Sequence, residues 1–248
     1  MKVISTDVNM YNPSILVDGC REAGIPLTWL QIDQLIRYYE MLAEKNKVMN
    51  LTAVIQWEDV QVRHYLDSLL LSKVMDLSAV RSVLDLGTGA GFPGIPLKIV
   101  FPHLHMTLAD SLQKRIRFLD EVIRELALTG IRTVHGRAED LGHLPEFRER
   151  YDLVVSRAVA NLSSLSEYCI PFVRTGGVFV SYKASEVEEE VRAAEAAVRK
   201  LGGEKPAVTT LPLPMSEMAR SFVVVRKKKM TPSCYPRKAG IPSKNPLT

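Results

Sequence analysis

The first third of the chain has the hydrophobic spacing of helices. Thr28 and Gln31 have the spacing of a capping box, in which two side chains satisfy amides of a first helical turn. Apolar side chains follow at the spacing of one helix face, at Leu35, Ile36, Tyr39 and Leu42. Asn46 and Asn50 indicate the end of this helix, and a second helix is predicted from about Trp57 to Val74. We therefore expect residues 1–78 to form a helical extension that packs on the rest of the chain.

The pattern changes at Ser82, where short β-branched runs begin to alternate with longer runs of helical periodicity. The predicted strands are Val83–Leu86, Met106–Ala109, Thr133–His135, Leu153–Val155, Val178–Ser181, Ala207–Leu211 and Phe222–Val225. The predicted helices are Gly94–Val100, Leu112–Leu126, Leu162–Pro171 and Glu186–Leu201. The last of them has a capping box in Ser185 and Glu188. This alternation predicts an α/β fold, a mostly parallel sheet covered on both faces.

The last two predicted strands are joined by a proline-containing loop without a helix. We therefore expect them to pair antiparallel at one edge of the sheet. A parallel sheet with an antiparallel last strand resembles the Rossmann-like sheet of class I S-adenosylmethionine-dependent methyltransferases. On this basis we expect residues 79–229 to form one such domain, followed by a basic C-terminal tail, residues 230–248.

Composition excludes several classes of protein. The chain has 248 residues, of which 46% are hydrophobic and 24% charged, enough for a large core without disulfide support. No apolar run reaches the roughly 18–20 residues of a membrane span, and the N-terminus has no secretory signal pattern. Three cysteines far apart give neither a disulfide framework nor zinc spacing. We expect a cytoplasmic protein without a metal site or a membrane partner.

The positive charge is concentrated at the C-terminal end. The chain has 32 bases and 28 acids, and seven of the bases but none of the acids fall in residues 226–248. Such a basic end is typical of a protein with a polyanionic partner, either nucleic acid or a membrane surface. A solvated tail that aids solubility is the alternative, and the charge count does not decide between them.

A glycine-rich loop is the most informative segment of the chain. Asp85 ends a predicted strand, and Gly87, Gly89 and Gly91 alternate in the loop before a helix that starts at Gly94. Glycines let a backbone turn sharply and approach a ligand, and the amides at a helix start attract an anionic group. The loop therefore indicates a nucleotide-like ligand at the carboxyl edge of the sheet.

Acidic residues near the loop favour one ligand over another. Asp85 would repel the pyrophosphate of a dinucleotide, but it would suit the cationic amino-acid end of S-adenosylmethionine. Asp110 follows the second strand, where it could accept hydrogen bonds from ribose hydroxyls. Residues 135–140 follow the third strand, where an adenine edge could lie. A nicotinamide oxidoreductase is therefore disfavoured, although the glycine spacing could be forced into its pattern.

These segments resemble the RsmG family, also called glucose-inhibited division protein B, of bacterial 16S ribosomal RNA guanine-N7 methyltransferases. The resemblance covers nearly the whole chain. The segments that carry it are Asp85–Gly94, Ser156–Ala158, Asn50–Ala53, Arg63–Ser68 and, as the most specific, Tyr235–Lys244. Departures are small: Met49 stands where many members have Trp, and Lys183-Ala184 replaces a more usual Lys-Gly.

The resemblance implies a cofactor, a substrate and site residues. The cofactor is S-adenosyl-L-methionine, and the substrate is a guanine in the decoding-region loop of 16S ribosomal RNA, free or in the small ribosomal subunit. The implied cofactor contacts are Gly87, Phe92, Ala138, Glu139 and Arg157. Together with the loop and ribose residues, Asp85, Gly89 and Asp110, they form the predicted cofactor site.

The residues themselves fit methylation of guanine N7. This nitrogen already has an available lone pair, so catalysis can work by positioning and desolvation without a general base. Arg157 is the catalytic candidate in such a mechanism, since it could pair with the methionine carboxylate or with an RNA phosphate. Cys169 lies in a predicted helix and is interpreted as core, which disfavours pyrimidine C5 methylation. No cluster of metal ligands accompanies the loop.

Basic residues outside the cofactor site are candidates for RNA contact. They are Lys183 after the fifth strand and, in a C-terminal loop, Arg237, Lys238 and Lys244. His64 and Asp67 lie one helical turn apart, and a structural role is favoured over a polar patch beside the glycine loop. The alternatives are a methyltransferase for a small molecule or another nucleotide, and a non-catalytic RNA-binding ribosome-assembly factor with the same fold.

Overall fold

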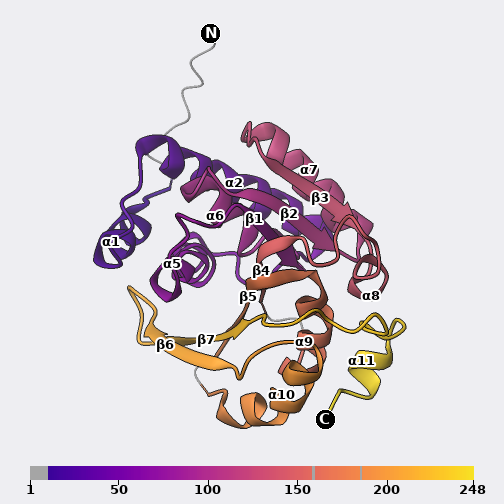
Figure 1. The fold of residues 1–248 in the computed structure, drawn as a ribbon. Coiled ribbons are helices and arrows are strands. Elements are labelled where there is room, and N and C mark those ends of the chain that lie inside the picture. The colour runs from indigo at the N-terminus through magenta and orange to yellow at the C-terminus, as the bar shows by residue number, and fades with distance from the viewer. Residues whose placement is uncertain (1–10, 158–159, 185) are drawn as a thin grey trace.

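A seven-stranded sheet forms the centre of the protein (Figure 1). The computed structural model describes residues 11–157, 160–184 and 186–248. The strand order is β3-β2-β1-β4-β5-β7-β6. The strands are β1 (Ser82–Leu86), β2 (His105–Asp110), β3 (Ile131–His135), β4 (Tyr151–Arg157), β5 (Val173–Lys183), β6 (Ala207–Pro212) and β7 (Ala219–Arg226). The first five run parallel, whereas β7 pairs antiparallel with both β5 and β6. The predicted parallel sheet with an antiparallel pair at one edge is confirmed.

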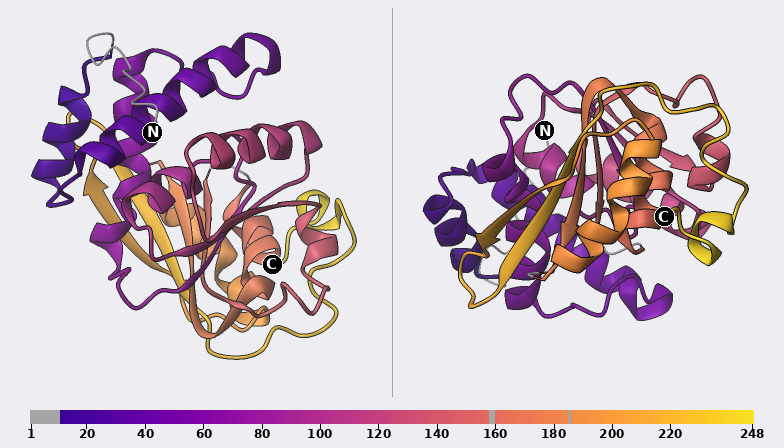
Figure 2. Two further views of the ribbon diagram at one scale, coloured as in Figure 1. Left: turned by 90° about the horizontal axis from the view of Figure 1, so that it is seen from above. Right: turned by 60° about the horizontal axis from the view of Figure 1, so that its bottom comes forward.

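Alternation along the strands gives the sheet two separate apolar faces, as the period of two requires. Val83 belongs to the core on one face, and its neighbour Leu84 belongs to the core on the other. The first face is covered by the N-terminal helices and by α6 (Gly94–Val100) and α7 (Gln113–Glu125). The second face is covered by α9 (Leu162–Cys169) and α10 (Glu188–Lys200), and Figure 2 shows the two layers on opposite sides. The shorter elements are α8 (Ala138–Leu141), the 3₁₀ turn η2 (Ile170–Phe172) and α11 (Ile241–Lys244).

The N-terminal extension shares the first core and contains one unpredicted element. It begins with α1 (Ser14–Glu22) and α2 (Trp29–Met49), and the predicted capping box of Thr28 and Gln31 is present. The helix α2 ends before Asn50, as predicted, and Asn50 itself takes the left-handed conformation. The second predicted helix is interrupted, because residues 61–66 form a π-helix that widens the turn before Asp67. Its parts are α3 (Trp57–Val60), η1 (Gln61–Leu66), α4 (Asp67–Leu69) and α5 (Leu71–Val74).

The capping box predicted for the start of α10, with Ser185 and Glu188, is not tested by the described residues. The helix begins at Glu188 after the N-cap residue Val187, which makes no side-chain cap. Ser185 itself lies outside the described residues. Within the described part of the chain, none of the helices has the length and apolar character of a membrane span.

Residues 230–248 are bound to the domain as an ordered C-terminal segment and do not form a loose tail. Arg148 donates to the carbonyl oxygens of Tyr235 at 2.7 Å and Thr231 at 2.8 Å. Leu247 is buried in the second core. Lys244 lies in the single turn of α11, so the predicted loop is in part helical. The Ser164 hydroxyl of α9 donates to the Pro242 carbonyl at 2.7 Å, a buried bond that fixes the segment over α9.

Candidate active site

A cleft runs along the carboxyl edge of the parallel strands. It consists of two adjoining hollows of about 400 and 330 Å³, which share Gly87 and Ser111. The first hollow is further lined by Leu51, Thr52, His64, Thr88, Gly89, Ala90, Phe92, Asp110, Arg115 and Arg157. The second is further lined by Leu86, Ala109, Gly136, Arg137, Ala138, Glu139, Leu165 and Tyr168. The ends of β1, β2, β3 and β4 thus meet in one site, as the parallel topology requires.

The glycines of the loop have two different tasks. Gly87 and Gly89 line the first hollow with φ of 72° and 62°, a region that disfavours side chains. Gly91 and Gly94 instead face the core. A Cβ on Gly94 would lie 2.3 Å from Leu108 Cδ2, and one on Gly91 would lie 2.7 Å from the Tyr38 hydroxyl. Only the first pair leaves backbone open to a ligand.

Asp85 supports this loop from below. Its Oδ2 accepts hydrogen bonds from the Thr88 hydroxyl at 2.7 Å and the Gly94 amide at 2.9 Å. The residue is fully buried, lines neither hollow, and its Oδ1 has no partner among the described residues. Burial raises the pKa of this carboxyl to about 6. The prediction that Asp85 faces a cationic ligand is therefore wrong in geometry, because this side chain is directed under the helix start.

Asp110, unlike Asp85, reaches the cleft, although its side chain is largely buried. It lines the first hollow, and its Oδ2 accepts from the Gly89 amide at 3.0 Å and from Arg115 at 3.1 Å. Its Oδ1 accepts from the Leu112 amide at 2.9 Å. The carboxylate is thus fixed at the end of β2, where hydroxyl groups of a ligand could reach its remaining lone pairs.

The second hollow contains the other predicted contacts. Ala138 and Glu139 line it at the start of α8. The Glu139 Oε1 accepts a hydrogen bond from the Gly240 amide at 2.9 Å, which joins the C-terminal segment to this hollow. Tyr168 of α9 also lines it, and sequence reasoning missed this residue because nothing in its helical segment marks it as functional.

Arg157 is held in a charged network at the end of the first hollow. Its guanidinium donates to Asp67 Oδ2 at 2.7 Å and to the Arg63 carbonyl at 3.1 Å. A second nitrogen lies 3.1 Å from His64 Nδ1. Arg220 donates to the other oxygen of Asp67 at 2.6 Å. Arg157 therefore lines the cleft, and its ionic partner among the described residues is the buried Asp67.

Phe92 provides the surface on which this network rests. The His64 ring stacks on it with centroids 4.2 Å apart, and the Arg157 guanidinium carbon lies 5.2 Å from its centroid. Sequence reasoning favoured a structural role for His64 and Asp67. The structure gives them that role and also places them at the site, a position that the resemblance of Arg63–Ser68 could have indicated.

His64 is neutral in the folded protein. Burial, reinforced by the charge of Arg157, lowers its pKa from 6.5 to about 3. Its Nε2 lies 3.0 Å from the Thr52 hydroxyl, so both ring nitrogens have partners. It is therefore unsuited to act as a general base.

Replacing His64 with glutamine is expected to flatten the pH dependence of stability. The unfolded chain protonates this histidine near pH 6.5, but the lowered pKa keeps it neutral in the folded state down to about pH 3. The wild-type protein therefore loses stability as the pH falls through this window. The free energy of unfolding of the wild type, relative to that of the glutamine variant, should therefore rise with pH. The expected slope is roughly 1.4 kcal/mol per pH unit between about pH 4 and 6.5.

Urea denaturation of both proteins at several pH values measures this difference. Asp85 contributes the opposite slope, because its raised pKa of about 6 favours folding at lower pH. Its contribution is common to both proteins and cancels. Parallel stability curves would contradict a neutral, buried His64.

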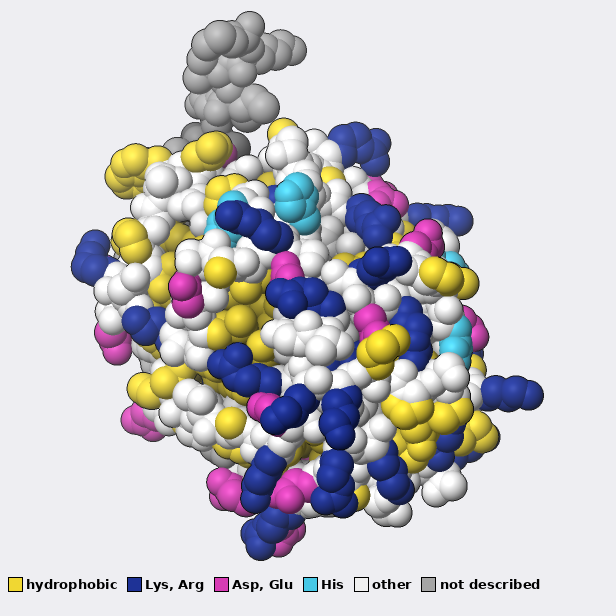
Figure 3. All heavy atoms as spheres, in the orientation of Figure 1, with side chains coloured by type: hydrophobic (Ala, Val, Ile, Leu, Met, Phe, Trp, Pro, Cys, Tyr) yellow, Lys and Arg dark blue, Asp and Glu magenta, His cyan; other side chains and the backbone are white. Residues whose placement is uncertain are grey.

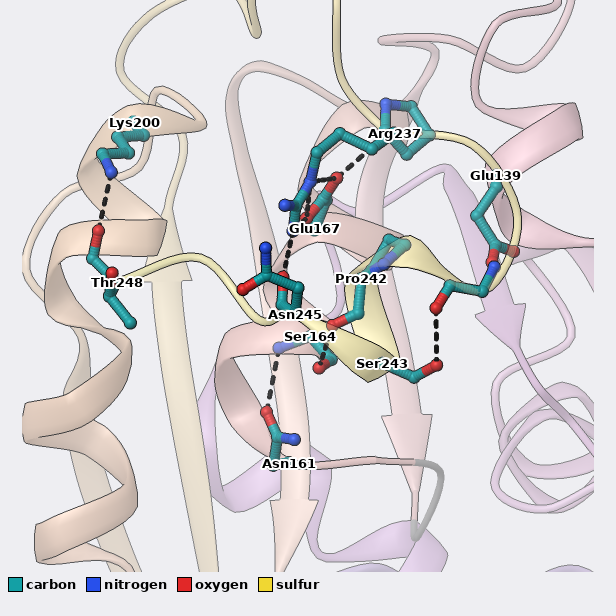
Figure 4. A network of polar contacts seen from close by, with 12 residues as sticks. Glu139, Asn161, Ser164, Glu167, Lys200, Arg237, Pro242, Ser243, Asn245 and Thr248 are labelled. Carbon is teal, nitrogen blue, oxygen red and sulfur yellow. Dashed lines mark hydrogen bonds and ion pairs between the residues drawn. The ribbon is translucent and has the colours of Figure 1, made fainter.

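Two of the residues predicted to contact RNA form ion pairs within the protein. Lys183 Nζ bonds to Glu190 at 2.7 Å and to the Ala160 carbonyl at 2.9 Å. Arg237 forms an ion pair with the fully buried Glu167 at 2.7 Å (Figure 4). Both cations are thus paired with carboxylates of the protein itself, and their contact with RNA stays a prediction. Lys238 and Lys244 are exposed on the C-terminal segment and stay predictions.

The basic surface is wider than the C-terminal segment. In the orientation of Figure 1, Lys and Arg side chains gather on the lower part of the surface with Asp and Glu among them (Figure 3).

Among the residues that the structure describes, no group of three or more His, Cys, Asp or Glu side chains could hold a metal ion.

Comparison with known proteins identifies the family of this chain. Residues 31–218 match the family model of rRNA small subunit methyltransferase G. The chain is 48% identical to ribosomal RNA small subunit methyltransferase G of Desulforamulus reducens over 94% of this chain and 97% of that protein. It is 44% identical to the protein of the same name from Bacillus subtilis, over 92% and 96% of the two chains.

A solved structure supports the fold. The S-adenosylmethionine-dependent methyltransferase SibL in its apo form superposes with a TM-score of 0.55 and 16% identity, over 90% of this chain and 72% of that one. This likeness confirms the predicted Rossmann-like class I methyltransferase fold. From the family match and the high identity over nearly the full chain, this protein belongs to the rRNA small subunit methyltransferase G family.

Proposed function

We propose that this protein transfers a methyl group from S-adenosyl-L-methionine to N7 of one guanine in the decoding-region loop of 16S ribosomal RNA, in the cytoplasm. The observation that carries the proposal is the two-part cleft, in a chain of this family, with Phe92 and Arg157 at one end and Ala138 and Glu139 at the other. The names of the relatives support ribosomal RNA as the substrate.

The cleft fits an elongated nucleoside with an amino-acid end. Its two hollows, about 400 and 330 Å³, lie within the range of about 300–1,000 Å³ that ligand sites occupy. They meet at Gly87, where the lack of a side chain leaves the passage open. Ala138 and Glu139 would hold the base, Asp110 the ribose hydroxyls, and Gly89 the amino-acid end. When bound, S-adenosylmethionine supplies an electrophilic methyl group on a positively charged sulfur.

The described side chains around the cleft suit a nucleophile that brings its own lone pair. His64 is neutral and has partners on both nitrogens, and Asp85 is buried under the loop. Cys169 is buried and lines neither hollow, and burial raises its pKa well above the usual value, which disfavours the reactive thiolate. Guanine N7 needs neither a base nor a cysteine, so positioning and exclusion of water are the protein's contribution.

The proposal is tested with purified protein, labelled S-adenosylmethionine and small ribosomal subunits from cells that lack this protein. One guanine should become labelled, and the RNA should break there after borohydride and aniline treatment, which cleaves at N7-methylguanosine. Subunits from cells that contain the protein are the control and should accept no label. Labelling of another base or another atom would overturn the proposal. Binding without any transfer would identify a non-catalytic assembly factor instead.

A further inference from the structure

A third hollow adjoins the cofactor cleft at one end. Its volume is about 450 Å³. His64 and Arg157 line both this hollow and the first one, so the two hollows meet at these side chains, which form one wall of each. The remaining described lining residues are Val54, Arg63, Asp67, Tyr182, Lys183, Ala184 and Arg220.

The charge of this hollow is positive. Four cations and one carboxylate are among its described lining residues, and the carboxylate, Asp67, is shared by Arg157 and Arg220. Arg63 is exposed, and its ion pair with Asp59 is long at 4.0 Å. A cationic rim of this kind attracts a phosphate group of a nucleic acid.

The lining of the third hollow suits a flat base. Val54, Ala184 and the ring of Tyr182 contribute apolar surface. The bonds of Arg157 to Asp67, His64 and the Arg63 carbonyl use three of its five N–H groups. The others could donate to the O6 oxygen of guanine, whereas adenine presents an amino donor at that position. A donor at this position would favour guanine over adenine.

We propose that the third hollow receives the target nucleotide, flipped out of its RNA loop, with its purine base against the His64–Arg157 wall and its phosphate at Arg63. This inference rests on the proposed function and adds the place and the residues of the substrate. In the transfer, the bond between sulfur and the methyl carbon breaks as the bond from N7 to that carbon forms. The positive charge passes from sulfur to the base, and no proton leaves.

Two substitutions of exposed residues test the site. Ala184→Trp fills the hollow and should lower kcat/KM for small subunits at least a hundredfold. Arg63→Ala removes a phosphate contact, so it should raise KM for the subunit about tenfold with little change in kcat, and it should reduce the salt dependence of binding. Both variants should bind S-adenosylmethionine as the wild type does in calorimetry. Arg199→Ala, an exposed arginine in the last turn of α10, is the matched control and should match the wild type.

The outcomes separate this inference from the proposed function. If the wild type forms N7-methylguanosine and both variants do so at the wild-type rate, the third hollow is not the substrate site. If either variant loses affinity for S-adenosylmethionine, the hollow belongs to the cofactor site and the inference also fails. Should Ala184→Trp not fold, Arg63→Ala decides alone. Absence of N7 methylation by the wild type would defeat the proposed function itself.

Discussion

Replacing Asp67 with alanine is expected to lower the free energy of unfolding by about 3 kcal/mol and methyl transfer by about a hundredfold or more. Asp67 is 2% exposed and is the shared partner of Arg157 and Arg220, at 2.7 and 2.6 Å. Its loss leaves two guanidinium groups without their carboxylate. Their side chains are 16% and 21% exposed, so water compensates in part. The wall on Phe92 then loses its fixed geometry.

Urea denaturation and kinetics at saturating substrates measure the two effects separately. Asp59→Ala is the matched control for stability, because Asp59 lies in the same helical region and its side chain is 53% exposed. Loss of that surface carboxylate should change stability by less than about 1 kcal/mol. Affinity for S-adenosylmethionine should fall far less than kcat in the Asp67 variant. If the Asp67 variant keeps the stability and the kcat of the wild type, Asp67 does not fix the position of Arg157.

Replacing Glu167 with glutamine is expected to lower the free energy of unfolding by about 3 kcal/mol and to weaken S-adenosylmethionine binding several-fold. The Glu167 side chain is fully buried and receives the Arg237 guanidinium on both oxygens. Arg237 lies three residues before Gly240, whose amide bonds to Glu139 in the second hollow (Figure 4). Release of Arg237 should therefore loosen the base end of the cleft.

Denaturation and calorimetry with S-adenosylmethionine test this second expectation. Lys205→Ala is the control, because it breaks the pair of Lys205 with Glu195, in which Lys205 is 78% exposed. That change should cost less than about 1 kcal/mol. If the Glu167 variant keeps wild-type stability, the C-terminal segment is held by its other contacts. If stability falls but the affinity stays, the segment has no link to the cofactor site.

The sheet and its binding edge could be predicted because their signals are local. The strands β1 and β2 are short apolar runs, and they end at or one residue after their predicted last residues. The glycine loop follows β1 directly, and parallel strands bring their carboxyl ends to one edge. Gly87, Gly89, Phe92, Asp110, Ala138 and Glu139 therefore line the cleft as expected.

The partners of the charged residues could not be predicted. Arg157 meets Asp67 across 90 residues of sequence, Arg220 meets it across 153, and Arg237 meets Glu167 across 70. A sequence shows that these side chains are charged, but not which opposite charge the packing of distant elements places within 3 Å. The same holds for Asp85, whose direction depends on the turn of the loop above it.

The sequence by itself thus determined the fold class, the position of the binding edge and the backbone that approaches the ligand, because periodicity and glycine spacing act over a few residues. Only the tertiary structure decided which charges remain exposed at the site. The π-helix of residues 61–66 and the ordered C-terminal segment bring buried carboxylates to Arg157 and Arg237. A buried charge requires a partner, and long-range packing alone selects it.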